Sequence, residues 1–280
     1  PESGTDKTVS NITLEDVKDF YTKNLAPDNA EIIIVGNVSE EEVANKLSFL
    51  KRSPKKNQKL LPFKTVTTPG ETTIVFAHKD KSPQAQIRVV GRGLRYSGLG
   101  DYYKAGIANY PLGGMFNSRI NLKLREQKGW TYGARSGFDG SDYTDKFYVS
   151  TSVKSSATDS AVVEIMFDLD AYLKDGITPE EMSFTKKSIG QKDALKYETA
   201  GQKASFMKYI IDNNFNGELV NQQLSILNNL TKTEVDKIAK SYIHPTQMYI
   251  IVVGDRAEIL ESLKKLGYPV KEVDIDEIGK

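Results

Sequence analysis

Residues 109–136 read NYPLGGMFNSRINLKLREQKGWTYGARS and carry more potential chemistry than any other stretch of the chain. Within them Phe116, Ile120 and Leu124 are spaced four residues apart, which places their apolar side chains on one face of a helix. Gly129 is expected to end that helix, because glycine tolerates the left-handed backbone conformation that terminates many helices. We therefore predict a half-buried helix in the middle of the stretch.

After Gly129 the residues alternate as they do in a strand. Tyr132, Ala134 and Ser136 fall on one strand face, and the two small side chains leave room for a ligand beside the tyrosine. Arg125 falls in the last turn of the predicted helix. This arrangement predicts that the guanidinium of Arg125 and the phenol of Tyr132 face one cavity.

Both groups are hydrogen-bond donors at neutral pH, so they suit a polarised carbonyl or its oxyanion and cannot by themselves activate water. A structural interpretation stays open, and composition alone favours it. Arg125 can stabilise a helix C-terminus by about 0.3–1 kcal/mol through the helix dipole. Tyr132 can be a strand aromatic whose hydroxyl lies in water. Trp130, on the same predicted strand face, is either a wall of the cavity or part of the core.

The composition excludes several classes of protein. The chain of 280 residues has 38 Lys and Arg against 37 Asp and Glu, so no net field favours nucleic acid or an anionic membrane. It has no cysteine and two histidines, which leaves no disulfide and no thiolate metal site. His78 and His244 have no carboxylate or histidine at a ligand spacing, and we interpret them as structural or surface residues.

No apolar run approaches the roughly eighteen residues that a membrane span needs. The first residues contain neither a signal peptide nor an initiating methionine. We therefore expect a soluble fragment or processed piece of a protein. The glycines at 91 and 93 and the pair Gly113–Gly114 lack the third glycine of a dinucleotide loop, and we predict that the pair forms the tight start of a helix.

One pattern of elements occurs twice. The first copy has a helix start, a proline at the helix exit, an apolar strand and a glycine at Thr13, Pro27, Ile32–Val35 and Gly36. The second copy has the same features at Thr231, Pro245, Ile250–Val253 and Gly254. One interval separates the copies, since 231 − 13 and 254 − 36 both equal 218. A shared interval indicates a duplication, in which the chain holds the last part of one unit and the whole of the next.

The other patterns predict early strands, then a block of helices, then a closing strand. Strands are expected at 72–78, 84–90 and 146–153, helices near 101, 158–175, 179, 200–211 and 219–228, and an exposed linker at 51–64. This order is typical of an α+β fold, a two-layer domain in which a mostly antiparallel sheet packs against a block of helices. Residues 1–55 are predicted to be the C-terminal part of a preceding, zinc-type repeat unit with the start of the linker. Residues 56–280 are predicted to be the complete second unit.

With LGGMFNSR at 112–119, LREQKGWTYG at 124–133 and VVGD at 252–255, the chain resembles the pitrilysin-type zinc peptidases. These are the inverzincins, which include insulysin and the mitochondrial processing peptidase. In that family two duplicated halves close around a chamber, and the first half binds zinc through His-x-x-Glu-His and a distal Glu. The resemblance covers essentially the whole chain. This chain has no His-x-x-Glu-His, so the resemblance implies the end of a first half followed by an entire second half.

The resemblance also implies roles for residues. The second half of a pitrilysin-type peptidase contributes an Arg and a Tyr that reach the substrate across the chamber, and the motifs place these at Arg125 and Tyr132. A weaker alternative frame places them two residues earlier, at Lys123 and Trp130. Zn²⁺ and the glutamate that activates water belong to the missing N-terminal half or to a partner subunit. This chain is therefore expected to bind no metal, to hydrolyse no peptide alone, and to act on unstructured peptides once assembled with the zinc-bearing half.

A second hypothesis is a catalytically silent scaffold or peptide-binding subunit of the same fold. The presence of both Arg125 and Tyr132 disfavours it mildly, because a pure scaffold has no need of that pair. The absence of cysteine fits a bacterial envelope and the cytoplasm alike. The periplasm or cell envelope of a bacterium is slightly favoured.

Overall fold

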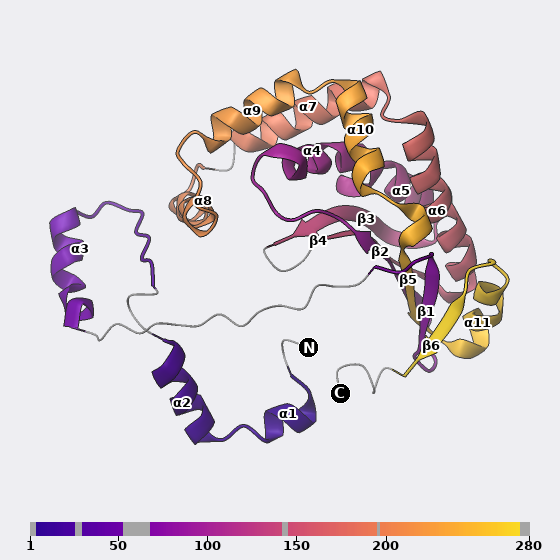
Figure 1. Ribbon diagram of the computed structural model, residues 1–280, viewed down its shortest axis with the longest axis horizontal. Coiled ribbons are helices and arrows are strands. Elements are labelled where there is room, and N and C mark those ends of the chain that lie inside the picture. The colour runs from indigo at the N-terminus through magenta and orange to yellow at the C-terminus, as the bar shows by residue number, and fades with distance from the viewer. Residues whose placement is uncertain (1–3, 26–29, 53–67, 142–144, 195–196, 275–280) are drawn as a thin grey trace. The chain divides into compact units, whose positions relative to one another are not determined.

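The computed structural model describes residues 4–25, 30–52, 68–141, 145–194 and 197–274 (Figure 1). The chain divides into two compact units, one built from residues up to 63 with 194–214, and the other from most of the remaining chain. Most of the predicted linker at 51–64 lies outside the described residues, as does the proline exit at Pro27.

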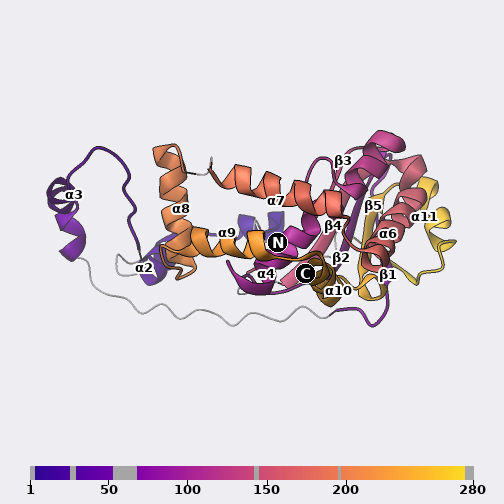
Figure 2. The same ribbon diagram turned by 90° about the horizontal axis from the view of Figure 1, so that it is seen from above.

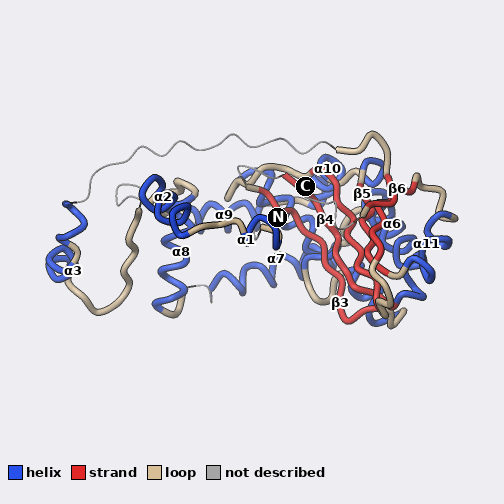
Figure 3. The backbone as a smooth tube through the Cα atoms, turned by 90° about the horizontal axis from the view of Figure 1, so that it is seen from below, coloured by secondary structure: helices blue, strands red, loops and turns tan. Residues whose placement is uncertain are grey.

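The second unit is built on a six-stranded sheet with the order β3-β4-β2-β5-β1-β6 (Figure 3). Its strands are β1 (Thr73–His78), β2 (Gln84–Arg92), β3 (Thr131–Gly140), β4 (Asp145–Lys154), β5 (Tyr249–Gly254) and β6 (Val270–Val273). The pairings β3·β4, β4·β2 and β2·β5 are antiparallel, whereas β1 pairs in parallel with β5 and β6. The sheet is therefore mostly antiparallel, and the predicted α+β class is confirmed.

Several helical segments of the second unit pack against one face of this sheet, and others pack against those helices (Figure 1). They are α4 (Gly100–Asn109), η3 (Tyr110–Gly114), α5 (Arg119–Asn121), η4 (Leu122–Gln127), η5 (Ser155–Ala157), α6 (Thr158–Asp175), α7 (Pro179–Ala194), α9 (Leu219–Asn229), α10 (Lys232–Tyr242), η6 (Pro245–Gln247) and α11 (Arg256–Lys264). Helix α6 ends at Gly176, whose φ of 75° requires glycine, as the sequence predicts. Helices α7 and α9 lie next to each other where Lys186 Nζ donates to the carbonyl of Asn228 at 2.7 Å (Figure 2).

The strands bury alternate side chains, because one face of the sheet meets the helices and the other does not. Ile74 and Phe76 in β1, like Ile250 and Val252 in β5, are fully buried in the core that the sheet shares with α4, α6 and α10. Fully burying a side chain of this size contributes roughly 1.5–3 kcal/mol. The opposite face carries the polar residues of β2, β3 and β4, and we call it the open face of the sheet.

The edge strand β3 is protected by side chains from the helices. Asn121 Oδ1 accepts the backbone N–H of Ala134 at 2.8 Å, and Asn109 Nδ2 donates to the carbonyl of Ser136 at 2.8 Å. Further along, the hydroxyl of Tyr102 donates to the carbonyl of Phe138 at 3.1 Å. These bonds satisfy outward backbone groups that an edge strand otherwise offers to another chain. They also tie residues 109–121 to β3, which positions the site described below.

The first unit contains only helices and connecting segments among its described residues. These helices are α1 (Asp6–Ser10), α2 (Leu14–Asn24), α3 (Glu40–Lys46), η2 (Ser48–Arg52) and α8 (Ala200–Asp212). Helix α2 matches α10 of the second unit: each spans 11 residues and begins with a capping box, at Thr13 and Thr231 respectively. The helical part of the predicted repeat is therefore present in both copies.

The two copies differ in burial and in strand formation. Val235, Ile238 and Ile250 of the second copy are buried. The residues 218 positions earlier, Val17, Phe20 and Ile32, are exposed by 54, 63 and 54%. The predicted strand at residues 32–35 is wrong for the described chain, since these residues belong to no sheet. A strand needs a neighbour to pair its backbone groups, and the described residues supply none in this unit.

Candidate functional site

Residues 109–136 form a compact turn system that ends in the edge strand. The short helix α5 lies between two π-helical segments, η3 and η4, and strand β3 follows them. Ile120 and Leu124 are buried and Gly129 ends the helical segment with a φ of 63°, as predicted. Phe116 does not belong to the buried stripe: it precedes α5 and is 63% exposed. Gly113 and Gly114 end η3 and begin no helix, so the predicted helix start is wrong.

Gly113 is required for the close approach of η3 to β3. A Cβ at this position would lie 2.2 Å from Ser136 Oγ and 2.6 Å from the backbone nitrogen of Ser136. Only glycine fits there without moving backbone. The contact brings the glycine pair beside the middle of β3.

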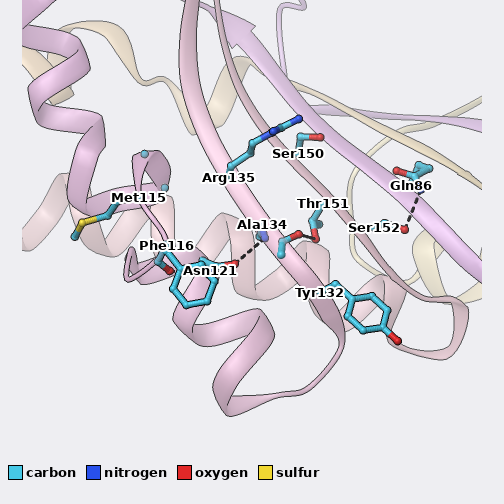
Figure 4. A pocket seen from close by; sticks show the side chains of 13 residues that line it. Gln86, Met115, Phe116, Asn121, Tyr132, Ala134, Arg135, Ser150, Thr151 and Ser152 are labelled. Atoms are coloured by element: carbon cyan, nitrogen blue, oxygen red, sulfur yellow. Dashed lines mark hydrogen bonds between the residues drawn. The ribbon is translucent and has the colours of Figure 1, made fainter. Parts of the chain in front are cut away.

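A cavity of about 560 Å³ opens between this turn system and the open face of the sheet (Figure 4). Its lining consists of Gln86, Gly113, Gly114, Met115, Phe116, Asn121, Tyr132, Gly133, Ala134, Arg135, Ser150, Thr151 and Ser152. None of these residues is acidic. The cavity therefore presents hydroxyl, amide and guanidinium groups together with one aromatic ring on each side.

Tyr132 lies at the rim of the cavity because β3 is irregular there. The register with β4 shifts between Thr131 and Ala134, and the Thr131 hydroxyl both donates to the carbonyl and accepts from the N–H of Gly133. This bulge turns Tyr132 outward, so that it is 90% exposed while Ala134 and Ser136 are buried. The prediction that the three share one face is wrong, because the extra residue of a bulge reverses the alternation.

Arg125 lies in the last helical turn, as predicted. It does not itself line the cavity, but it contacts Phe116, which does. Its guanidinium carbon lies 4.4 Å from the centre of the Phe116 ring, a cation–π contact. Its Nη1 lies 3.5 Å from Oε1 of Glu126, which is an ion-pair contact without hydrogen-bond geometry. Nη1 is buried and has no hydrogen-bond acceptor in the described part of the chain. A buried guanidinium donor without an acceptor is costly.

Lys123 and Trp130, the alternative pair of site residues, lie away from the cavity. Lys123 Nζ lies 2.8 Å from Asp168 Oδ1 and 3.5 Å from Glu164 Oε2 on α6. Burial acts to lower the pKa of Lys123, but the hydrogen bond and charge of Asp168 outweigh it and raise the pKa. Trp130 is half-buried and packs against the core. Lys123 thus joins η4 to α6, and neither residue lines the cavity.

The cavity includes residues that the sequence did not single out. Asn109 and Asn121 are buried amides that hold the edge strand, and Asn121 also lines the cavity. The sequence marks these two residues only by placing an amide where the helical spacing predicts an apolar side chain. Arg135, Ser150 and Ser152 had no such signal, because only strand pairing brings them together.

No group of three metal-ligating side chains occurs within residues 4–274 as far as they are described. Nδ1 of His78 accepts the backbone N–H of Arg256 at 3.1 Å, at the start of α11, and His244 is exposed. Both agree with the structural interpretation. Separately, none of the described helices has the length and apolar character needed to cross a bilayer.

Comparison with known proteins relates the chain to one family. Residues 11–189 match the family described as the peptidase M16 inactive domain. The solved structure of a peptidase M16 inactive domain from Pseudomonas fluorescens has a similar fold, with a TM-score of 0.79 at 21% identity. That similarity covers 91% of this chain and 61% of the other.

Two curated relatives are similar over much of the sequence. A Helicobacter pylori protein described as the non-peptidase homolog YmxG is 22% identical over 264 residues, which cover 90% of this chain and 58% of the relative. An uncharacterized zinc protease of Streptomyces coelicolor is 25% identical over 199 residues, which cover 68% of this chain and 42% of the relative. The chain thus spans about half the length of the curated relatives it matches.

Proposed function

This chain belongs to the peptidase M16 inactive domain family, and we propose that it is the half of a zinc-dependent endopeptidase that binds no metal. It closes the catalytic chamber and supplies Arg125 and Tyr132 to the scissile carbonyl of an unstructured peptide. The observation that carries this proposal is the cavity beside Arg125 and Tyr132. Tyr132 stands at its rim, and the guanidinium of Arg125 stacks on Phe116 in its wall with Nη1 unsatisfied.

The described residues do not fit a catalytic zinc ion, because they hold no cluster of three metal-ligating side chains. When bound on the other half, zinc supplies Lewis-acid activation of water. The contribution of this chain is to orient the peptide. Donors from Arg125 and Tyr132 hold the carbonyl oxygen and stabilise the negative charge that develops on it.

We also propose that residues 1–55 complete the sheet and core of a preceding repeat unit. Supporting this, Val17, Phe20 and Ile32 are exposed although their counterparts 218 residues later are core residues. Contiguous exposed apolar side chains mark surfaces that another chain or segment covers. In this proposal the cover is the rest of a zinc-type unit, which would flank residues 32–35 with strands as β1 and β2 flank β5.

Matched substitutions in the two copies test this assignment. Val235→Asp is expected to destabilise the chain by about 3–5 kcal/mol, because it buries an unpaired charge. Val17→Asp, its counterpart, is expected to change the free energy of unfolding in urea by less than about 0.5 kcal/mol. It should instead weaken binding to the zinc-bearing half at least about tenfold, since it places a charge in the interface core. Equal loss of stability in both variants would contradict the assignment.

The proposed function is tested by mixing the chain with the polypeptide that carries the zinc half. Cleavage of a fluorogenic unstructured peptide is expected only in the mixture, and a chelator should abolish it. Activity of this chain alone would overturn the proposal. So would a zinc half whose full activity does not depend on this chain.

A second candidate function is a catalytically silent scaffold, which the relative named as a non-peptidase homolog favours. In that case the mixture forms a complex but cleaves nothing. Size-exclusion chromatography and the cleavage assay on the same sample separate the two functions.

A further inference from the structure

A row of three polar side chains crosses the open face of the sheet beside the cavity. Ser150 of β4 pairs with Arg88 of β2 on one side and with Arg135 of β3 on the other. Side chains at paired positions of antiparallel strands point to the same face, so the two arginines flank the serine hydroxyl. Arg135 and Ser150 line the cavity and lie side by side in Figure 4.

The charges of this row are not compensated within the described chain. Elsewhere on the open face Lys146 Nζ lies 2.9 Å from Asp139 Oδ2, and Arg92 Nε lies 3.4 Å from Asp145 Oδ2. Among the described residues no carboxylate lies within ion-pair distance of Arg88 or Arg135, and both are exposed. On the open face, Arg92 and Lys146 are therefore paired with carboxylates, whereas Arg88 and Arg135 have no carboxylate partner among the described residues.

The geometry suits one small anion. Two strand spacings place the backbones of Arg88 and Arg135 about 9–10 Å apart, which long guanidinium side chains span easily. An anion above Ser150 can accept hydrogen bonds from the guanidinium groups of Arg88 and Arg135 and from the Ser150 hydroxyl. Two residues further along β2 and β4, Gln86 Nε2 donates to Ser152 Oγ, and Ser152 Oγ donates to Gln84 Oε1. Both hydrogen bonds are 2.9 Å long. These amide and hydroxyl groups add polarity without adding a competing negative charge.

We propose that Arg88 and Arg135, with Ser150 between them, bind a carboxylate of the peptide that occupies the cavity. This inference rests on the proposed function for the peptide, and it adds a specificity site on the open face. The carboxylate is either an acidic side chain or the C-terminus of the peptide. Both share the planar two-oxygen geometry that a guanidinium recognises.

The test measures binding of fluorescently labelled unstructured peptides to the 280-residue chain by anisotropy. Four peptides of one length carry Glu or Gln at a central position and a free or amidated C-terminus. The wild-type chain is expected to bind at least one carboxylate form about tenfold more tightly than its neutral counterpart, as two exposed ion pairs allow. The Glu/Gln pair reports a side-chain carboxylate, and the free/amidated pair reports the C-terminus.

The double variant Arg88→Gln, Arg135→Gln is expected to abolish this preference, so that the carboxylate and neutral peptides bind it with equal affinity. Arg92→Gln is the matched control, because it removes one charge from the same face at a residue paired with Asp145, and it should keep the preference. A wild-type chain without preference, or a double variant that retains it, would overturn the proposal. The binding assay needs no zinc half, so an inactive mixture would defeat the proposed function alone.

Discussion

The Tyr132→Phe variant, assembled with the zinc-bearing half, is expected to lose about 100- to 1000-fold in kcat, the usual effect of removing one donor to a developing oxyanion. The loss should fall on kcat, because the hydroxyl acts on charge that is greatest in the transition state. Steady-state kinetics of peptide cleavage provide the measurement, with the zinc content of the assembled enzyme determined in parallel.

Two features of the structure make this experiment clean. Tyr132 is 90% exposed, so loss of its hydroxyl removes no packing and should leave thermal unfolding of the chain unchanged. Tyr148→Phe is the matched control, because Tyr148 lies on the same open face, packed over Gly137, and does not line the cavity. Unaltered turnover in Tyr132→Phe, or an equal loss in Tyr148→Phe, would refute the assigned role.

Replacing Arg125 with glutamine is expected to lower kcat/KM by about 100-fold or more, because the variant loses a charged donor to the carbonyl oxygen. Its effect on stability should stay below about 1 kcal/mol, since the 3.5 Å contact with the exposed Glu126 contributes little. Arg125→Lys keeps the charge but not the planar stack on Phe116, and it should recover only part of the activity. Peptide kinetics and urea unfolding of the same preparations provide both readouts.

Lys123→Gln discriminates between the two possible frames of the Arg/Tyr pair. Because Lys123 neutralises the buried carboxylate of Asp168, its loss is expected to cost about 1–3 kcal/mol of stability. The folded fraction should keep its kcat. A large loss of kcat in a stable Lys123→Gln variant would favour the frame of Lys123 and Trp130 over that of Arg125 and Tyr132.

Local signals predicted much of this fold. Strands β1 to β5, the end of α6 at Gly176 and the helix starts at Thr13 and Thr231 all follow from neighbouring residues in the sequence, whereas β6 was not predicted. The position of Arg125 in the last helical turn follows in the same way. The compartment and the site roles of Arg125 and Tyr132 stay predictions.

The wrong predictions concern residues whose conformation depends on contacts with residues distant in the sequence. Phe116 fits the helical stripe by spacing, yet the turn at η3 places it outside the core. The side of β3 to which Tyr132 points depends on a one-residue bulge against β4. Residues 32–35 have the composition of a strand but no partner strand among the described residues of their unit.

By itself, the sequence determined the class of fold, the starts of the matching helices α2 and α10 and the helical turn that carries Arg125, because periodicity, capping and glycine placement act over a few residues. Only the tertiary structure decided which side chains border the cavity, that Tyr132 stands outward at its rim, and that Arg88 and Arg135 flank Ser150. Strand pairing joins residues dozens of positions apart, and a single bulge reverses the face of every residue beyond it. Neither the strand pairing nor the bulge can be read from the pattern of neighbouring residues.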